Sequence, residues 1–244
     1  MDGQKIKYVP YPTGKHHLDP ENDVCGKPQD RPAFHQDEEL KQAAIKAAKV
    51  FEEEGKNLSN SIEFKKTQEG SSKEGEIKIE RQWAMPSKWT FTIFPIKKLL
   101  KEEVVGSMWV DPFAGRYSPA NIKNDLNPSS NAETYLDALE FLKSLPSESF
   151  NGVLFDPPYS ITQARECYEG FGMEKLEIKP TSMQYWAECR NEISRILKRG
   201  GKAICCGWTS QGLGKNRGFQ MQRILMVPHG GSRNDTIVTV EFKL

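Results

Sequence analysis

From Trp83 onward, four short strand-like runs each stop at an aspartate. The runs span residues 107–110, 121–124, 134–136 and 152–155, and they stop at Asp111, Asp125, Asp137 and Asp156. Strand-like runs alternate with helical stretches, which favours a mostly parallel sheet covered on both faces. In an open α/β sheet, ligands bind outside the carboxyl ends of the strands. We therefore expect the four carboxylates to converge on one site.

Two predicted helices and a further strand continue this pattern. Apolar spacing predicts a helix over residues 139–145 and another over 182–199. The pair Gly200 and Gly201 is expected to end the second helix, with basic residues in its last turn. A strand over residues 202–206 is expected to follow.

The last part of the sequence has a different pattern. Residues 220–227 and 236–242 flank a turn at 229–232, which predicts an antiparallel hairpin. The expected fold class is therefore α/β, with a mostly parallel, doubly wound, Rossmann-like sheet and a C-terminal antiparallel hairpin. An N-terminal arm precedes this domain.

Residues 1–82 are expected to form that arm or a small helical lobe, and the main domain is expected to span 83–244. The N-terminal segment is rich in turn residues and carries no strand-like apolar run. Between residues 37 and 54, apolar side chains recur at helical spacing and predict one amphipathic helix. They are Leu40, Ala44, Ile45, Ala48 and Phe51. Residues 59–75 are polar and are expected to form a loop.

Length and charge leave several classes of partner open. A chain of 244 residues can bury a real core, and this length suits one α/β domain with an appendage. Lysine and arginine total 34 against 33 aspartates and glutamates, so the net charge of +1 neither requires nor excludes a polyanionic partner. Any contact with nucleic acid must come from a local patch.

The cysteines and the apolar segments indicate a cytoplasmic protein. There are five cysteines and no C-x-x-C pair, which argues against a disulfide framework. No N-terminal apolar segment or membrane-length run is present, so neither a signal peptide nor a membrane partner is expected. His16, His17, Cys25 and His35 are metal-ligand types, but their spacing matches no zinc pattern and no metal site is expected.

The tetrapeptide from Asp156 to Tyr159 has a composition suited to holding a planar amine for methylation. The lone pair of an exocyclic amine is delocalised into its ring, so the nitrogen is a poor nucleophile. Oxygens of the Asp156 side chain and the Pro157 main chain can each accept one amine proton, which frees the lone pair. Pro157 and Pro158 fix φ and lack N–H groups, while Tyr159 offers a flat face to an extruded base. The alternative is a rigid Pro-Pro turn with an exposed aspartate.

With these residues, the chain resembles the amino-group DNA methyltransferases, especially those specific for adenine. The resemblance covers about residues 83–244. Phe91–Pro95 is similar to the segment beside the cofactor, Asp111–Gly115 to the cofactor loop, and Asp156–Tyr159 to the catalytic motif. Their order along the chain is the one expected when the cofactor motifs precede the catalytic motif. The resemblance implies S-adenosylmethionine as cofactor and a Rossmann-like methyltransferase fold.

The resemblance also implies roles for individual residues. Asp125 would accept hydrogen bonds from the ribose hydroxyls of the cofactor, and Leu126 would lie against its adenine. Asp137 and the N–H of Ala138 would meet the edge of that adenine. Capping of a helix is the alternative role for Asp125 and for Asp137. The implied catalytic residues are Asp156, Pro157, Pro158 and Tyr159, and the other implied cofactor-binding residues are Phe91, Thr92, Asp111, Phe113, Ala114 and Gly115.

Two departures from the family pattern bear on these expectations. The family's loop commonly continues with a serine and a second glycine, whereas Arg116–Pro119 follows Gly115 here. Larger members carry a long target-recognition region, whereas about twenty residues, 160–180, follow the catalytic motif here. Sequence specificity is therefore expected to be weak, or to come from the N-terminal arm or another subunit, including a homodimer partner. Around the last hairpin, Trp208 and four basic residues are candidates for nucleic-acid contact, with a solvated charged rim as the alternative: Lys215, Arg217, Arg223 and Arg233.

The expected function is transfer of a methyl group from S-adenosylmethionine to the exocyclic amine of adenine in DNA. The cytosine amine and an RNA base are alternative substrates, because their amines share the same chemistry. An alternative from another class is a non-catalytic nucleic-acid-binding subunit of a methyltransferase complex.

Overall fold

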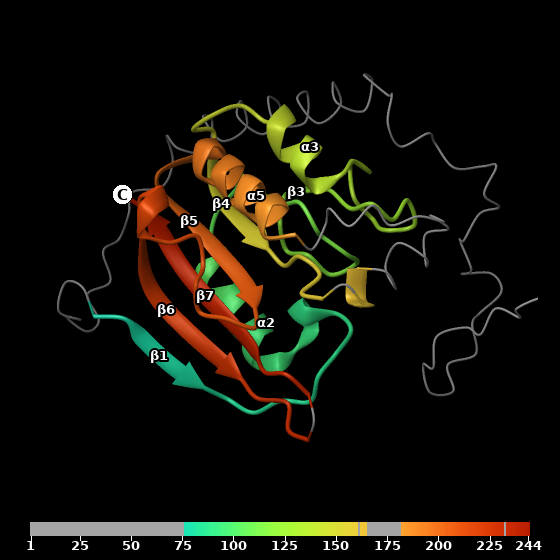
Figure 1. Ribbon diagram of the computed structural model, residues 1–244, viewed down its shortest axis with the longest axis vertical. Coiled ribbons are helices and arrows are strands. Elements are labelled where there is room, and N and C mark those ends of the chain that lie inside the picture. Colours follow the sequence, from blue (N-terminus) through green and yellow to red (C-terminus); the bar gives the residue numbers. More distant parts are fainter. Residues whose placement is uncertain (1–75, 161, 165–181, 232) are drawn as a thin grey trace, which may run out of the picture. The chain divides into compact units, whose positions relative to one another are not determined.

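The computed structural model describes residues 76–160, 162–164, 182–231 and 233–244 (Figure 1). The predicted helix at 37–54, the predicted loop at 59–75 and the histidines and Cys25 considered above lie outside these residues. The β-strands are β1 (Lys78–Arg81), β2 (Trp109–Asp111), β3 (Ile122–Lys123), β4 (Phe150–Phe155), β5 (Leu197–Gly207), β6 (Phe219–Val227) and β7 (Thr236–Lys243). The helices are the 3-10 turns η2 (Thr90–Thr92) and η4 (Lys215–Arg217) and the α-helices α2 (Phe94–Glu103), α3 (Ala138–Ser144) and α5 (Met183–Ile196).

The seven strands form one mixed sheet in the order β1-β6-β7-β5-β4-β2-β3. All neighbouring pairs are parallel except those of β7, which runs antiparallel to both β5 and β6. The expected fold class is confirmed: the sheet is mostly parallel and Rossmann-like, and the C-terminal hairpin reverses one strand. None of the described helices is long and apolar enough to span a membrane.

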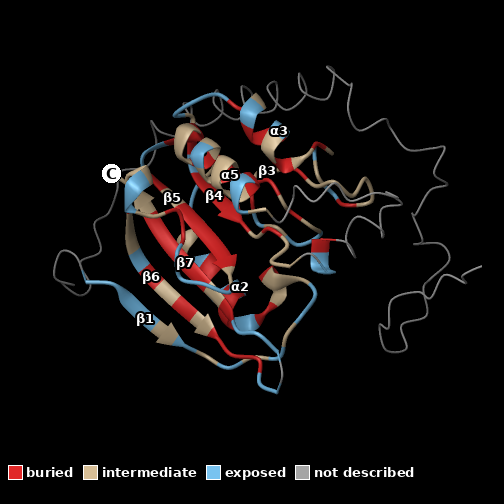
Figure 2. Ribbon diagram, viewed as in Figure 1, coloured by how far each residue is buried: buried red, intermediate tan, exposed pale blue. Residues whose placement is uncertain are grey.

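Helices cover both faces of the central strands, with α3 and α5 on one face and α2 on the other (Figure 1). Side chains of β4 alternate between two cores, because successive residues of a strand point to opposite faces. Val153 and Phe155 pack with α3 and α5, whereas Leu154 packs with α2. The strand interiors are buried, as Figure 2 shows for β5 and β7. A sheet buried on both faces holds the strand ends in fixed positions.

Three local features differ from the sequence expectations. First, Lys78–Arg81 forms a strand, parallel to β6, ahead of the expected domain start at Trp83. The sequence of this edge strand shows no alternation of apolar and polar residues, because three of its four residues are lysine, glutamate or arginine. The sheet therefore takes in part of the segment expected to be an arm.

Second, the helix expected to reach residue 199 ends at Ile196. Leu197 is fully buried, takes an extended conformation and pairs with Phe150 of β4. The ammonium group of Lys243 donates to the carbonyl oxygens of Ser194 and Leu197, both at 2.8 Å, and so satisfies carbonyls at the helix end. The helix therefore ends where Leu197 is buried and where Lys243 caps it, and not at the glycine pair that predicted its end.

Third, the strand expected at residues 134–136 is reduced to one parallel bridge between Asn124 and Thr134. The Asn124 side chain is fully buried, and its hydrogen bonds replace the backbone pairing that a longer strand would have made. Its amide nitrogen donates to the carbonyls of Pro112 (3.2 Å) and Leu136 (2.9 Å). Its amide oxygen accepts from the Thr134 hydroxyl (2.8 Å) and the Leu136 N–H (2.9 Å). One side chain thus joins the segments that follow β2 and β3.

Candidate active site at the strand ends

Three of the four aspartates predicted from the strand pattern lie close enough to interact. Asp111 ends β2, Asp125 follows β3 and Asp156 follows β4, and β2 is hydrogen-bonded to both of the other strands. The charges of Asp156 and Asp125 both contribute to raising the pKa of Asp111. The expected convergence therefore holds for these three carboxylates.

Asp111 organises the loop that follows β2. Its side chain is fully buried, and one carboxylate oxygen accepts the Phe113 N–H at 2.9 Å. The other oxygen accepts the Ser118 hydroxyl at 2.6 Å. Burial raises the pKa of Asp111 to about 8, against the lowering effect of these two hydrogen bonds. The sequence did not single out Ser118, whose hydroxyl group closes the loop by its bond to Asp111.

The raised pKa of Asp111 predicts a pH-dependent stability. Between its ordinary value of 3.8 and about 8, the folded protein holds a proton that the unfolded chain releases. Stability contributed by this group is therefore full below pH 3.8 and falls as the pH rises, by at most about 1.4 kcal/mol per pH unit. Asp111→Asn should flatten the dependence of the urea midpoint on pH from 5 to 8, whereas exposed Asp235→Asn should not. Parallel curves for wild type and Asp111→Asn would contradict this assignment.

Gly115 and Asp125 join the ends of β2 and β3. The Gly115 N–H donates to one Asp125 carboxylate oxygen at 2.7 Å, and the Asn127 N–H donates to the other at 2.7 Å. Gly115 has a φ of +54°, and a Cβ there would lie 3.3 Å from the Trp89 ring. No helix begins within residues 126–137, all of which the structure describes, so Asp125 is not a helix cap. Burial raises the pKa of its carboxyl group, although the two N–H donors oppose that shift.

Asp137 caps α3, as the alternative for this residue proposed. One carboxylate oxygen accepts from the N–H groups of Leu139 (2.9 Å) and Glu140 (3.3 Å). The other accepts the hydroxyl of Tyr185 from α5 at 2.9 Å. Asp137 therefore ties two helices together, and its expected contact with cofactor adenine, like that of Ala138, stays a prediction.

Asp156 follows β4 and forms hydrogen bonds with two hydroxyl groups. The Tyr159 hydroxyl donates to its carboxylate, and the Thr90 hydroxyl of η2 hydrogen bonds with it as well. Burial raises the pKa of Asp156, while both hydroxyl groups lower it. The side chain is half-buried, which excludes the exposed Pro-Pro turn considered from the sequence. Sequence reasoning missed Thr90, although it directly precedes the segment expected beside the cofactor.

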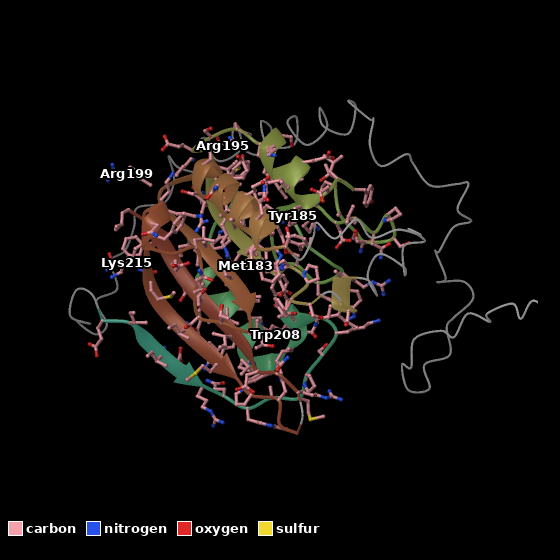
Figure 3. The ribbon with its side chains drawn as sticks, viewed as in Figure 1. Met183, Tyr185, Arg195, Arg199, Trp208 and Lys215 are labelled. Carbon is pink, nitrogen blue, oxygen red and sulfur yellow. The ribbon has the colours of Figure 1, made fainter. Side chains whose placement is uncertain are left out.

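Two pairs of aromatic rings lie in the loops near the strand ends. The ring centroids of Tyr159 and Trp208 are 5.8 Å apart, and those of Trp89 and Tyr117 are 5.6 Å apart. Trp208 lies just beyond the end of β5, in the region of the strand ends (Figure 3). Tyr117 and Trp208 expose about half of their surface, 51% and 42% respectively. Of these rings, that of Tyr159 carries the hydroxyl group that contacts Asp156.

The segment Phe91–Thr92 anchors the turn that contains Thr90, a hydrogen-bond partner of Asp156. Phe91 is buried in the core shared with α2. The Thr92 hydroxyl donates to the Trp89 carbonyl at 2.8 Å and so fixes the turn that presents Trp89 and Thr90. Phe113 packs edge-on against Phe155, with ring centroids 5.8 Å apart. Ala114 is buried, and Leu126 is half-buried.

Two of the four basic residues near the last hairpin have structural partners. Arg223 is buried and forms ion pairs with Glu80 of β1 and with Glu102 (2.7 Å) and Glu103 (3.2 Å) of α2. Arg217 donates to the Asn191 side chain at 2.8 Å and to the Leu213 carbonyl at 3.0 Å. The interpretation of these two arginines as phosphate ligands is therefore not supported, whereas Lys215 and Arg233 remain candidates.

Comparison with known proteins gives no family assignment. The sequence matches no protein-family model and no curated protein. Similar solved structures include TrmN from Thermus thermophilus, with 17% identity, 62% of this chain and 49% of TrmN covered, and a TM-score of 0.41. They also include a Burkholderia thailandensis 1,6-didemethyltoxoflavin-N1-methyltransferase with bound S-adenosylhomocysteine, with 12% identity, 60% and 75% covered, and a TM-score of 0.41.

A third similar structure is the Thermus thermophilus 16S rRNA N2 G1207 methyltransferase in complex with AdoMet and guanosine. Identity is 12%, coverage is 62% of this chain and 39% of that enzyme, and the TM-score is 0.35. This chain thus covers about half of the length of TrmN and less than half of the length of the rRNA methyltransferase. At these scores the similarities carry no argument about activity, which must come from the site itself.

Proposed function

We propose that this protein transfers a methyl group from S-adenosylmethionine to the exocyclic amine of adenine in DNA. The observation that carries the proposal is the position of Asp156. Its half-buried carboxylate lies beyond β4, among Tyr159, Thr90 and the rings beside them. It also lies near enough to Asp111 for their charges to interact. The motif and the loop that resemble those of the family thus meet at one edge of the sheet.

The loops after β2 and β3 fit the cofactor. Each Asp125 carboxylate oxygen accepts one backbone N–H and has further capacity to accept a ribose hydroxyl. Gly115 leaves free the space that a Cβ would fill beside Trp89. When bound, S-adenosylmethionine would supply an electrophilic methyl group on a positively charged sulfur. Burial raises the pKa of both Asp111 and Asp125, and a positively charged ligand beside them would favour their ionised forms.

The residues at Asp156 then activate the amine. In its ionised form, the carboxylate accepts one amine proton in a hydrogen bond, and the Pro157 carbonyl accepts the other. Both contacts draw the nitrogen toward tetrahedral geometry, so that its lone pair becomes available. The Asp156 side chain is partly withdrawn from water, which strengthens these hydrogen bonds. The rate gain comes from position and electrostatics.

The Tyr159 hydroxyl donates to the carboxylate that the target amine would use as its acceptor. Each carboxylate oxygen can accept more than one hydrogen bond, so the amine would either share Asp156 with this hydroxyl or displace it. The tyrosine therefore has two separable parts. Its ring offers a stacking surface, worth about 1–3 kcal/mol per base in other proteins, and its hydroxyl lowers the pKa of Asp156.

Tyr159→Phe should separate these two parts. Loss of the hydroxyl removes a donor to the ionised carboxylate, which raises the pKa of Asp156. The acidic limb of the kcat/KM profile should move to higher pH, while activity at high pH stays within a few-fold of wild type. Tyr159→Ala should also lose stacking and reduce kcat/KM by roughly tenfold to a hundredfold at every pH. Tyr135→Phe is the matched control, because that hydroxyl bonds the Ser130 carbonyl. An unmoved limb in Tyr159→Phe would argue against Asp156 as the titrating group.

Incubation with radiolabelled S-adenosylmethionine and a panel of DNA and RNA tests the proposed function directly. Nucleoside analysis of the products should show N6-methyladenine in DNA. Label on the cytosine amine or on RNA would replace the proposed substrate with one of the alternatives. Absence of transfer together with absence of cofactor binding by titration calorimetry would favour a non-catalytic nucleic-acid-binding subunit.

A further inference from the structure

The strand β1 and the residues after it expose large apolar side chains on one face of the sheet. Four of them are more than 40% exposed: Ile77, Ile79, Trp83 and Met85. They occupy alternate positions, and the intervening Glu80, Gln82 and Ala84 are half-buried. Backbone hydrogen bonds from Gln82 to Met226 and from Ala84 to Pro228 continue the pairing with β6 through this stretch. Alternate residues of an extended chain share one face, so these side chains point the same way.

The neighbouring strands extend this face. Ile79 pairs with Ile224 of β6, and Met226 pairs with Ile237 of β7. These three β6 and β7 residues are half-buried and belong to neither described core. Leu225, which points to the other face, is buried against α2. We call the set Ile77, Ile79, Trp83, Met85, Ile224, Met226 and Ile237 the β1 apolar face. Figure 2 shows β1 exposed and β6 alternating between buried and half-buried residues.

We infer that the predicted helix at residues 37–54 of the same chain packs across the β1 apolar face. In the sequence, residues 1–75 come just before Glu76 and Ile77, and Ile77 is the first residue of the β1 apolar face. An amphipathic helix needs a partner for its apolar stripe, because most helical stability in proteins comes from packing that stripe. The linker from residue 55 to 75 is long enough to let the helix fold back.

Size and charge match between helix and face. Eighteen helical residues extend about 27 Å, and the nine residues from Ile77 to Met85 extend about 30 Å in a strand. Exposed Arg81 lies on the same face as Ile79 and Trp83, since it shares their alternation. The acidic end of the helix, Glu52–Glu54, is a suitable partner for that guanidinium.

A second copy of the chain fits this region less well. The edge strand β1 contains three charged residues, Lys78, Glu80 and Arg81, and charged residues in an edge strand discourage the addition of another strand. A helix laid on the face avoids that edge and covers the exposed apolar side chains. Because this helix belongs to the same chain, no second molecule is needed to cover the face.

Photo-crosslinking in the full-length chain tests the inference. Benzoylphenylalanine in place of Ile79, which is 62% exposed, places the probe on the face without disturbing a core. A second variant carries the probe at Ile224, and a control carries it at exposed Lys98 on α2. After irradiation and digestion, both face probes should link to peptides from residues 37–54, and the control should not. Phe51→Asp should reduce the yield of these links by about tenfold or more.

An equal mixture of chains labelled with ¹⁴N and ¹⁵N identifies the origin of each link. Links within one chain pair fragments of the same isotope, which is the expected result. Mixed pairs would show that a second copy covers the face and would overturn the inference. Links from both face probes to other segments would overturn it as well. So would an absence of links from a probe that is shown to be photoreactive.

Discussion

Asp156→Asn is expected to reduce methyl transfer by about a thousandfold or more, the range in which positioned proton acceptors and charge stabilisation contribute. Asparagine keeps the size of the side chain but places an NH2 group or an uncharged oxygen against the target amine. Binding of S-adenosylmethionine should stay within a few-fold of wild type, because Gly115 and Asp125 lie on other loops. Single-turnover rates with labelled cofactor, and calorimetry on the same samples, measure the two quantities separately.

The complementary variant is Asp125→Ala. Loss of the proposed ribose acceptor should weaken cofactor binding strongly, while the turnover rate at saturating cofactor is affected less. Exposed Asp235→Asn, between β6 and β7, serves as the control for loss of one negative charge. If Asp156→Asn lost cofactor binding but retained turnover, the proposed roles of the two aspartates would have to be exchanged.

Gly152→Ala should have the largest effect on stability, about 3 kcal/mol or more by comparison with overpacked cores. A Cβ at Gly152 would lie 2.3 Å from the ring of Trp109, which is 2% exposed and pairs with Gly152 across β2 and β4. The indole has no free side toward which to shift, since it is held in the core beneath α2. Urea denaturation should show a lower midpoint with an unchanged slope.

Gly207→Ala is the matched control for this substitution. Gly207 ends β5, and a Cβ there would meet its first neighbour at 3.9 Å, an ordinary contact. Its stability should stay within about 0.5 kcal/mol of wild type. In Gly152→Ala, the additional change Trp109→Leu should recover part of the loss by making room for the methyl group. Equal midpoints for the two glycine variants would show that the ring can move.

The parts of the fold that follow from burial could be predicted from the sequence. The runs before Asp111 and Asp156 are apolar because their strands are buried on both faces, and that pattern is visible in one sequence. The hairpin of β6 and β7 was predicted from two strand-like runs that flank a turn. The convergence of Asp111, Asp125 and Asp156 followed from the rule that parallel strands end at one edge.

Features made by contacts between distant residues could not be predicted in this way. Asn124 replaces a strand with four side-chain hydrogen bonds, and nothing in its local sequence marks it. Thr90 hydrogen bonds with Asp156 from a turn 66 residues earlier in the chain. The early end of α5 depends on Lys243, which is beyond the reach of any local capping signal. Such contacts become visible once the strand order is known.

The position of β7 has a consequence for how the protein is made. This strand lies between β5 and β6, so residues 236–243 join the pair β1 and β6 to the rest of the sheet. During synthesis, the two parts emerge from the ribosome before the strand that connects them. Until β7 arrives, the backbone groups along one edge of β5 and one edge of β6 have no partner in the sheet, which leaves both edges open to pairing with another chain.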